Sequence, residues 1–158
     1  MLIVVLFCLC AASPAFAEHA DLVKIEKAER RMTLLSRTRI LRTYQISLGS
    51  SPSGPKRCEG DSKTPEGTYR ISGRNRGSAY HRSLRISYPN DNDRRRARER
   101  NCLPGGDIMI HGLPNGAGWL RSTHLARDWT LGCVAVTNDE IEEIWNLVPD
   151  GTKVEILP

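Results

Sequence analysis

The chain has 158 residues, with 23 Lys and Arg against 18 Asp and Glu, which gives a formal net charge of +5. It is 39% hydrophobic and 26% charged, with 13 Gly, 9 Pro and 5 Cys. This composition excludes collagen-like, coiled-coil and wholly disordered chains, and the length suits one domain with its own core.

The first segment, residues 1–17, carries no charge and begins with an apolar run. That run covers roughly half of the ~20 residues that a membrane-spanning helix needs. The segment ends in Ala15-Phe16-Ala17, a pattern typical of signal-peptidase cleavage, although no Lys or Arg precedes the apolar run. We predict a signal peptide over 1–17 and an exported protein from Glu18 onward, with no integral membrane segment after cleavage. A buried N-terminal helix is the alternative.

Between residues 21 and 48, apolar side chains alternate with polar ones. The alternating apolar residues are Val23, Ile25, Met32, Leu34, Ile40, Tyr44, Ile46 and Leu48. A period of two predicts half-buried antiparallel strands, here with turns near 29–30 and 36–38. Residues 49–67 are rich in Gly and Pro and predict a loop. Further strands are predicted over 68–71 and 83–87.

A run of charged residues, DRRRARER, covers Asp93 to Arg100. Such a run can bind phosphate, nucleic acid or polyanionic envelope material, or it can be the solvated face of a helix or loop. No aromatic residues interleave with the arginines to stack on bases. We therefore expect a solvated face and no nucleic-acid partner.

The C-terminal part carries the clearest helix signal. Thr137 and Glu140 fit a capping box. Four apolar residues then follow at helical spacing, Ile141, Ile144, Trp145 and Val148. Pro149-Asp150-Gly151 ends this helix, and 152–157 predict a closing strand. Trp145 belongs to the predicted core. The elements together predict one mostly-β domain, a sandwich or barrel-like sheet with a C-terminal helix.

Two short segments carry candidate chemistry. Residues 107–112 form an apolar strand that ends in His111-Gly112, and residues 129–136 form a small-residue turn that delivers Cys133 just before a strand. A thiol with a pKa of roughly 8.5 becomes a better nucleophile beside an imidazole. Gly132 lets a substrate approach the backbone closely. The pair is a candidate for acyl transfer; the alternative is a buried Cys133 and a hydrogen-bonded His111.

Three motifs in order carry a resemblance to a known family. They are Gly60-Asp61 with 64–69 (TPEGTY), Ile110-His111-Gly112, and Thr130-Leu131-Gly132-Cys133. From about Val23 to the C-terminus the chain resembles the L,D-transpeptidase (YkuD-domain) family of bacterial cell-wall enzymes. It is most similar to the branch containing the amidase that detaches Braun's lipoprotein from peptidoglycan, on the residues 54–56 (GPK), 87–90 (SYPN) and 133–138 (CVAVTN).

The resemblance implies that 18–158 is a catalytic domain with Cys133 as nucleophile and His111 as base, and that the Gly112 carbonyl orients the imidazole. It implies a periplasmic enzyme whose partners are peptidoglycan tetrapeptide stems, cleaved between diaminopimelate and D-Ala. A thioester then passes to an amine acceptor or to water. No metal or cofactor is implied.

One departure from the family pattern lies in the cysteine motif, where Leu131 stands in place of the usual His. Oxyanion stabilisation would then fall on the backbone amides of Leu131, Gly132 and Cys133. The alternative activities are hydrolytic, as an L,D-carboxypeptidase or as an amidase that releases peptidoglycan-bound lipoprotein. An alternative of another class is a non-catalytic peptidoglycan-binding module.

Supporting residues follow from their positions beside the motifs. Trp129, Thr130, His81 and His124 are candidates for substrate binding, and packing or hydrogen-bonding roles within the fold are the alternatives. Two of the five cysteines lie in 1–17. With Cys133 assigned as a free thiol, Cys58 and Cys102 become candidates for a disulfide, and two further free thiols are the alternative.

Overall fold

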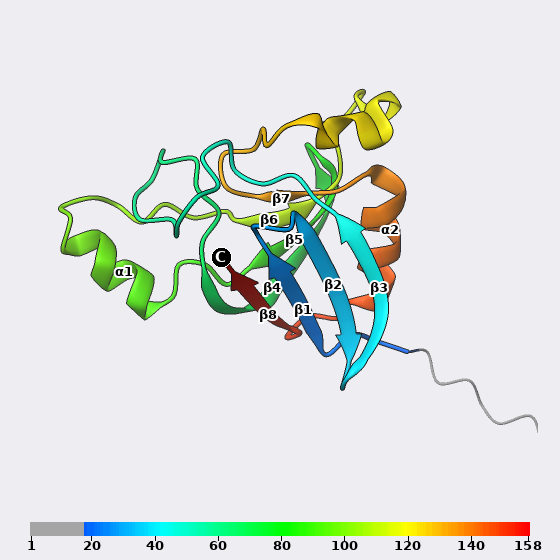
Figure 1. Ribbon diagram of the computed structural model, residues 1–158, viewed down its shortest axis with the longest axis horizontal. Coiled ribbons are helices and arrows are strands. Elements are labelled where there is room, and N and C mark those ends of the chain that lie inside the picture. The colour runs from blue at the N-terminus through cyan, green and yellow to red at the C-terminus, as the bar shows by residue number, and fades with distance from the viewer. Residues whose placement is uncertain (1–17) are drawn as a thin grey trace, which may run out of the picture.

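The computed structural model describes residues 18–158, and the predicted signal peptide at 1–17 lies outside this range. Within it, one sheet has the strand order β3-β2-β1-β8-β4-β5-β6-β7 and curls into a half-barrel (Figure 1). Its strands are β1 (Leu22–Glu26), β2 (Arg31–Ser36), β3 (Arg39–Gln45), β4 (Gly67–Ser78), β5 (His81–Ile86), β6 (Met109–His111), β7 (Val134–Ala135) and β8 (Lys153–Leu157).

Three helices accompany the sheet. They are α1 (Asp91–Arg98), the 3₁₀ helix η1 (Gly118–Ala126) and α2 (Asn138–Leu147). Figure 1 shows α1 and α2 at opposite ends of the molecule. Across residues 18–158, no helix has the length and apolar character needed to cross a membrane.

The predicted mostly-β, barrel-like single domain is confirmed. Strands β1, β2 and β3 pair antiparallel, as the alternation predicted, and β8 inserts between β1 and β4, parallel to β1. The capping box forms, with the Thr137 hydroxyl accepting from the Glu140 N–H. Trp145 is only 7% exposed and packs in the core. The C-terminal helix is therefore where the sequence placed it, followed by the predicted closing strand.

The expected inward position of Ile40 is wrong. Its side chain is 62% exposed, whereas Ile46 is 2% exposed. The pairing of β2 with β3 shifts register between Leu34 and Leu35, so that Leu35 faces Ile40 while Leu34 faces Arg42. This irregularity adds one residue to β3 and reverses which side chains face inward, and Leu41 packs against the core instead. Alternation alone cannot reveal such a shift.

The charged run from Asp93 to Arg100 lies mostly in α1, whose arginines are exposed. Among the charged residues of the run, Asp93 alone is buried. Its carboxylate accepts from the Asn90 N–H at 3.0 Å, completing a capping box, and from the Tyr69 hydroxyl at 3.1 Å. The run is thus a solvated helix face with one structural carboxylate at its start.

Residues 46–49, which follow β3, hold in place the turn at 130–133 that presents Cys133 (the cysteine turn). Ser47 forms an antiparallel bridge with Ala135, and Gly49 forms a parallel bridge with Thr130. The Thr130 N–H donates to the Leu48 carbonyl at 3.1 Å. The turn before β7 is therefore held between this segment and strand β6.

The register shift generates a prediction for two isoleucines in the same part of the chain. Ile46→Ala should lower the free energy of unfolding by roughly 2–5 kcal/mol, because it opens a cavity in the core. Ile40→Ala, the matched control, should change it by less than about 0.5 kcal/mol. Urea unfolding followed by circular dichroism measures both. Equal losses would contradict the register described here.

Candidate active site

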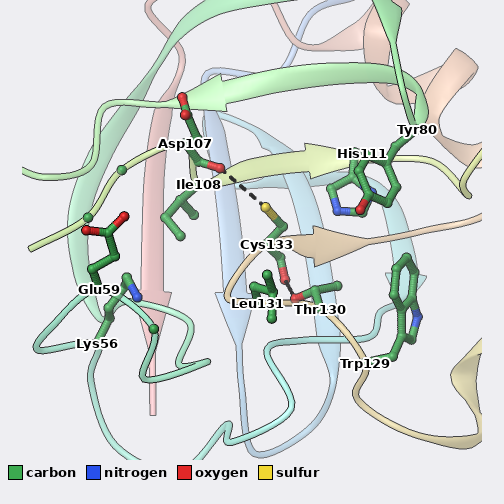
Figure 2. Close-up of a pocket in the computed structure, with 13 residues that line it drawn as sticks. Lys56, Glu59, Tyr80, Asp107, Ile108, His111, Trp129, Thr130, Leu131 and Cys133 are labelled. Carbon is green, nitrogen blue, oxygen red and sulfur yellow. Dashed lines mark hydrogen bonds between the residues drawn. The ribbon is translucent and has the colours of Figure 1, made fainter.

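The parallel pairing of β6 with β7 brings His111 and Cys133 together. Ile110 lies opposite Val134, and His111 lies opposite Ala135. Because successive side chains of a strand point to opposite faces, Cys133 and His111 share the face turned away from Ile110 and Val134. Both line one cavity of about 490 Å³ (Figure 2). The structure thus places both predicted catalytic side chains in one pocket.

The His111 imidazole is almost fully buried, with 3% exposure. Its Nδ1 lies 2.7 Å from the Gly112 carbonyl oxygen. Since a carbonyl only accepts, Nδ1 carries the proton and Nε2 keeps a free lone pair. Burial lowers the pKa of His111, and the hydrogen bond to Gly112 opposes this shift only in part. The imidazole is therefore neutral near pH 7 and able to accept a proton at Nε2.

Aromatic rings hold this imidazole in place. The ring of Tyr80 lies 4.4 Å from that of His111 between centroids, and the ring of Trp129 lies 5.9 Å from it. Tyr80 comes from the turn between β4 and β5, whereas Trp129 precedes the cysteine turn. Together they form one wall of the pocket (Figure 2). This wall covers one side of the imidazole.

The Cys133 thiol faces the Asp107 carbonyl, to which Sγ donates at 3.4 Å (Figure 2). Burial raises the pKa of the thiol, while a hydrogen bond from the Met109 backbone and the charge of Lys56 act in the opposite direction. The thiol is therefore protonated at neutral pH. Cys133 and His111 are thus a neutral thiol and a neutral imidazole that line the same pocket (the neutral pair), with the thiol bonded to the Asp107 carbonyl and not to the imidazole.

The turn that presents Cys133 is built by Thr130 and Gly132. The Thr130 hydroxyl donates to the Cys133 carbonyl at 2.8 Å and accepts from the Gly132 N–H at 3.1 Å. Gly132 has φ +135°, and a Cβ there would lie 2.7 Å from the Lys63 carbonyl oxygen, so only glycine fits. Because the Gly132 N–H is already bonded, the amides of Leu131 and Cys133 are the better candidates for an oxyanion.

The remaining predicted residues differ in how near they lie to this pocket. Trp129, Thr130 and Leu131 line it. His81 lies outside its lining and bonds Glu142, with 2.7 Å between Nε2 and Oε1. His124 is also outside, buried behind Trp129, with Nδ1 3.2 Å from the Ser47 hydroxyl. These two histidines therefore have bonding roles within the fold in this structure.

Cys58 and Cys102 are joined by a disulfide, with their Cα atoms 5.8 Å apart. Cys133 is the free cysteine of residues 18–158. The disulfide connects the loop before β4 to the segment that follows helix α1, and both segments continue into the pocket lining. Over the same residues, no group of three or more His, Cys, Asp or Glu side chains is placed to hold a metal ion.

Sequence reasoning missed four polar residues of the pocket, namely Tyr80, Lys56, Glu59 and Asp107. Lys56 was noted only as part of the GPK resemblance, and Tyr80 lies in a turn with no catalytic pattern. Each reaches the pocket through a contact between segments distant in the sequence. The sequence signals near them came from GPK at 54–56 and from the Gly60-Asp61 and Asp107–Gly112 segments.

Comparison with known proteins points to one family. The YkuD model, described as the L,D-transpeptidase catalytic domain, matches residues 20–156. The Escherichia coli K12 protein named "Putative L,D-transpeptidase YafK" is 32% identical over 133 residues, which cover 80% of this chain and 46% of that protein. The chain thus spans less than half the length of the curated relatives it matches.

Solved structures agree with this match. The helical cell shape determining protein Pgp2 from Campylobacter jejuni superposes with a TM-score of 0.61 at 27% identity, over 85% of this chain and 46% of that one. Bd1075 from Bdellovibrio bacteriovorus, at 23% identity, shares the fold with a TM-score of 0.62, over 89% of this chain and 51% of that one.

The buried thiol generates a prediction for its titration. Iodoacetamide labelling of the peptide that contains Cys133, followed by mass spectrometry across pH, should give a higher apparent pKa in native than in urea-denatured protein. Burial of the thiol is the reason, because it disfavours the charged thiolate. Comparing apparent pKa values separates protonation from simple accessibility. A native value below the denatured one would contradict the neutral pair.

Proposed function

The chain belongs to the L,D-transpeptidase (YkuD) family, and from this premise we propose that it is a cysteine acyltransferase that acts on peptidoglycan stem peptides in the periplasm. One observation carries the proposal. The β6–β7 register puts the free Cys133 and a buried, Gly112-oriented His111 on one face of one pocket. The predicted signal peptide at 1–17 supports the location.

The first step is proton transfer from Cys133 to Nε2 of His111. A rotation of the thiol away from the Asp107 carbonyl brings it toward the imidazole. Sγ then attacks the carbonyl carbon of diaminopimelate, and the C=O electron pair moves onto oxygen. The N–H groups of Leu131 and Cys133 stabilise that oxyanion, since the Gly132 N–H is bonded to Thr130.

Collapse of the tetrahedral intermediate breaks the bond to D-Ala. The proton on His111 Nε2 passes to the leaving amine, and a thioester remains on Cys133. An acceptor amine next loses its proton to His111 and attacks the thioester, which regenerates the thiol and leaves a cross-link. Throughout, the Gly112 carbonyl keeps the Nδ1 proton in place and stabilises the transient imidazolium.

Hydrolysis by the same residues is the second candidate. Leu131 stands where the family pattern has His, and its side chain is 80% exposed at the edge of the pocket. Because the cross-linking members that the chain resembles usually have a histidine at this position, its absence favours water as the group that resolves the thioester. Released D-Ala would then identify an L,D-carboxypeptidase. Released lipoprotein would identify an amidase that acts on peptidoglycan-bound lipoprotein.

Incubation with disaccharide-tetrapeptides tests the proposal. With an amine acceptor present, the protein should form cross-linked dimers, detected by mass spectrometry. Loss of D-Ala without dimers, or release from lipoprotein-linked peptides, would identify the hydrolase. Cys133→Ala should reduce turnover by roughly 10³-fold or more, because the thioester cannot form. Equal behaviour of Cys133→Ala and wild type on every substrate would favour a non-catalytic binding module.

The lowered pKa of His111 sets the acid limb of activity. Only the neutral imidazole of His111 can act as the base. Because its pKa lies below 6.5, His111 is still mostly neutral when the pH falls to 6.5. We expect the acid limb of kcat/KM to have its midpoint below pH 6.5, measured with the tetrapeptide substrate. His111→Gln should abolish that limb along with most of the rate. A midpoint above 6.5 would show that protonated His111 is stabilised, contrary to its burial.

A further inference from the structure

The active-site pocket has a charged wall that the proposed reaction does not use. This charged wall consists of Lys56, Glu59 and Asp107. It lies opposite the wall of His111, Tyr80 and Trp129, and Cys133 lies between the two (Figure 2). Asp107 is paired with Arg85. Lys56 and Glu59 form no ion pair with each other, although both belong to the same short loop. Two opposite charges therefore border the pocket beside the nucleophile.

Lys56 retains a hydrogen-bond donor. Its side chain is 4% exposed, and Nζ donates to the Cys58 carbonyl at 3.1 Å and to Asp61 at 2.8 Å. An ammonium group has three N–H donors. The third N–H has no acceptor within residues 18–158, and the side chain lines the cavity. A buried, oriented cation with a spare donor suits a carboxylate ligand.

Glu59 supplies the opposite charge. Its side chain is exposed at the pocket and has no ion-pair partner within residues 18–158. Its backbone is fixed, because the Glu59 N–H donates to the Leu103 carbonyl at 2.7 Å and the neighbouring Cys58 is bonded to Cys102. A carboxylate held at this position can accept a hydrogen bond from a ligand ammonium group.

Asp61 makes the loop rigid. Its carboxylate accepts from Lys56 and from the backbone N–H groups of Arg57, Cys58 and Lys63, at 2.7 to 3.1 Å. Burial alone would raise the pKa of Asp61, but these hydrogen bonds outweigh it and lower the pKa. The Lys56 ammonium group and the backbone of Glu59 are thus held in position before any ligand binds, which reduces the entropic cost of binding.

We propose that Lys56 and Glu59 form a subsite for a zwitterionic α-amino-carboxylate group. The ligand carboxylate binds the free N–H of Lys56, and the ligand ammonium binds the Glu59 carboxylate. The inference rests on the proposed function, because the diaminopimelate of a stem peptide carries such a group at the free end of its side chain. The subsite would place that end on the charged wall while the acyl carbon lies at Cys133.

Binding to the inactive Cys133→Ala variant tests the subsite without turnover. Three tetrapeptides serve as probes, with diaminopimelate unmodified, acetylated on its free side-chain amine, or amidated on its free side-chain carboxyl. Titration calorimetry should show each modification weakening binding by about tenfold or more, since each removes one charge-assisted hydrogen bond. Amidation of the peptide tests the role of Lys56 without a substitution at Lys56, which would remove its buried contact with Asp61.

Glu59→Gln, made in the same Cys133→Ala background, tests the second half of the subsite. It should weaken binding of the unmodified peptide by about tenfold and leave binding of the acetylated peptide unchanged. Glu99→Gln, a control at an exposed glutamate outside the pocket, should change neither. Equal losses for both peptides, or no loss for either, would overturn the role of Glu59. Sensitivity to amidation alone would reduce the subsite to carboxylate binding and overturn the zwitterion proposal.

Turnover by the wild-type enzyme separates this inference from the proposed function. Cleavage of all three peptides with equal kcat/KM and equal binding would overturn the subsite alone. Selective binding without any cleavage would overturn the proposed reaction alone. Absence of both binding and cleavage would overturn both.

Discussion

The pairing of two very short strands, β6 and β7, is the constraint on which the site depends. A ladder of this length is weak by itself, and its position is fixed by the core. Ile110 and Val134 face each other with no exposure, and Ser47 bridges Ala135 from the other side. Since a shift of one residue would turn Cys133 to the opposite face, the same packing that stabilises the sheet also sets the catalytic geometry.

The chemistry that this geometry allows is that of a neutral pair. Burial acts on both partners, raising the pKa of Cys133 and lowering that of His111, so that neither is charged near neutral pH. An ion pair would make the thiol reactive toward any electrophile that entered the pocket. The thiol is bonded to the Asp107 carbonyl instead, so the proposed reaction would require it to turn toward the imidazole before it becomes nucleophilic. Under the proposed function, reactivity would thereby depend on substrate binding.

The parts of the structure that could be predicted from the sequence are those encoded locally. The capping box at Thr137 and the period of two in β1 and β2 depend on neighbouring residues, and both predictions held. Ile40 was assigned to the wrong face because a register irregularity between strands leaves no trace in the alternation. Tyr80 and Glu59 reach the pocket through a hairpin turn and a disulfide-linked loop, so their roles depend on contacts that no local pattern encodes.

The two walls of the pocket are held by different forces. The aromatic wall around His111 is packed onto the sheet, whereas the charged wall depends on the Cys58–Cys102 disulfide and on the buried Lys56–Asp61 pair. A sheet with a well-packed core tolerates few changes, while a loop anchored at a few points can change its exposed side chains without moving the core. The proposed catalytic residues and the proposed subsite therefore belong to separately stabilised parts of this fold. Glu59 can change while Cys133 and His111 keep their positions, because its side chain forms no hydrogen bond or ion pair within residues 18–158.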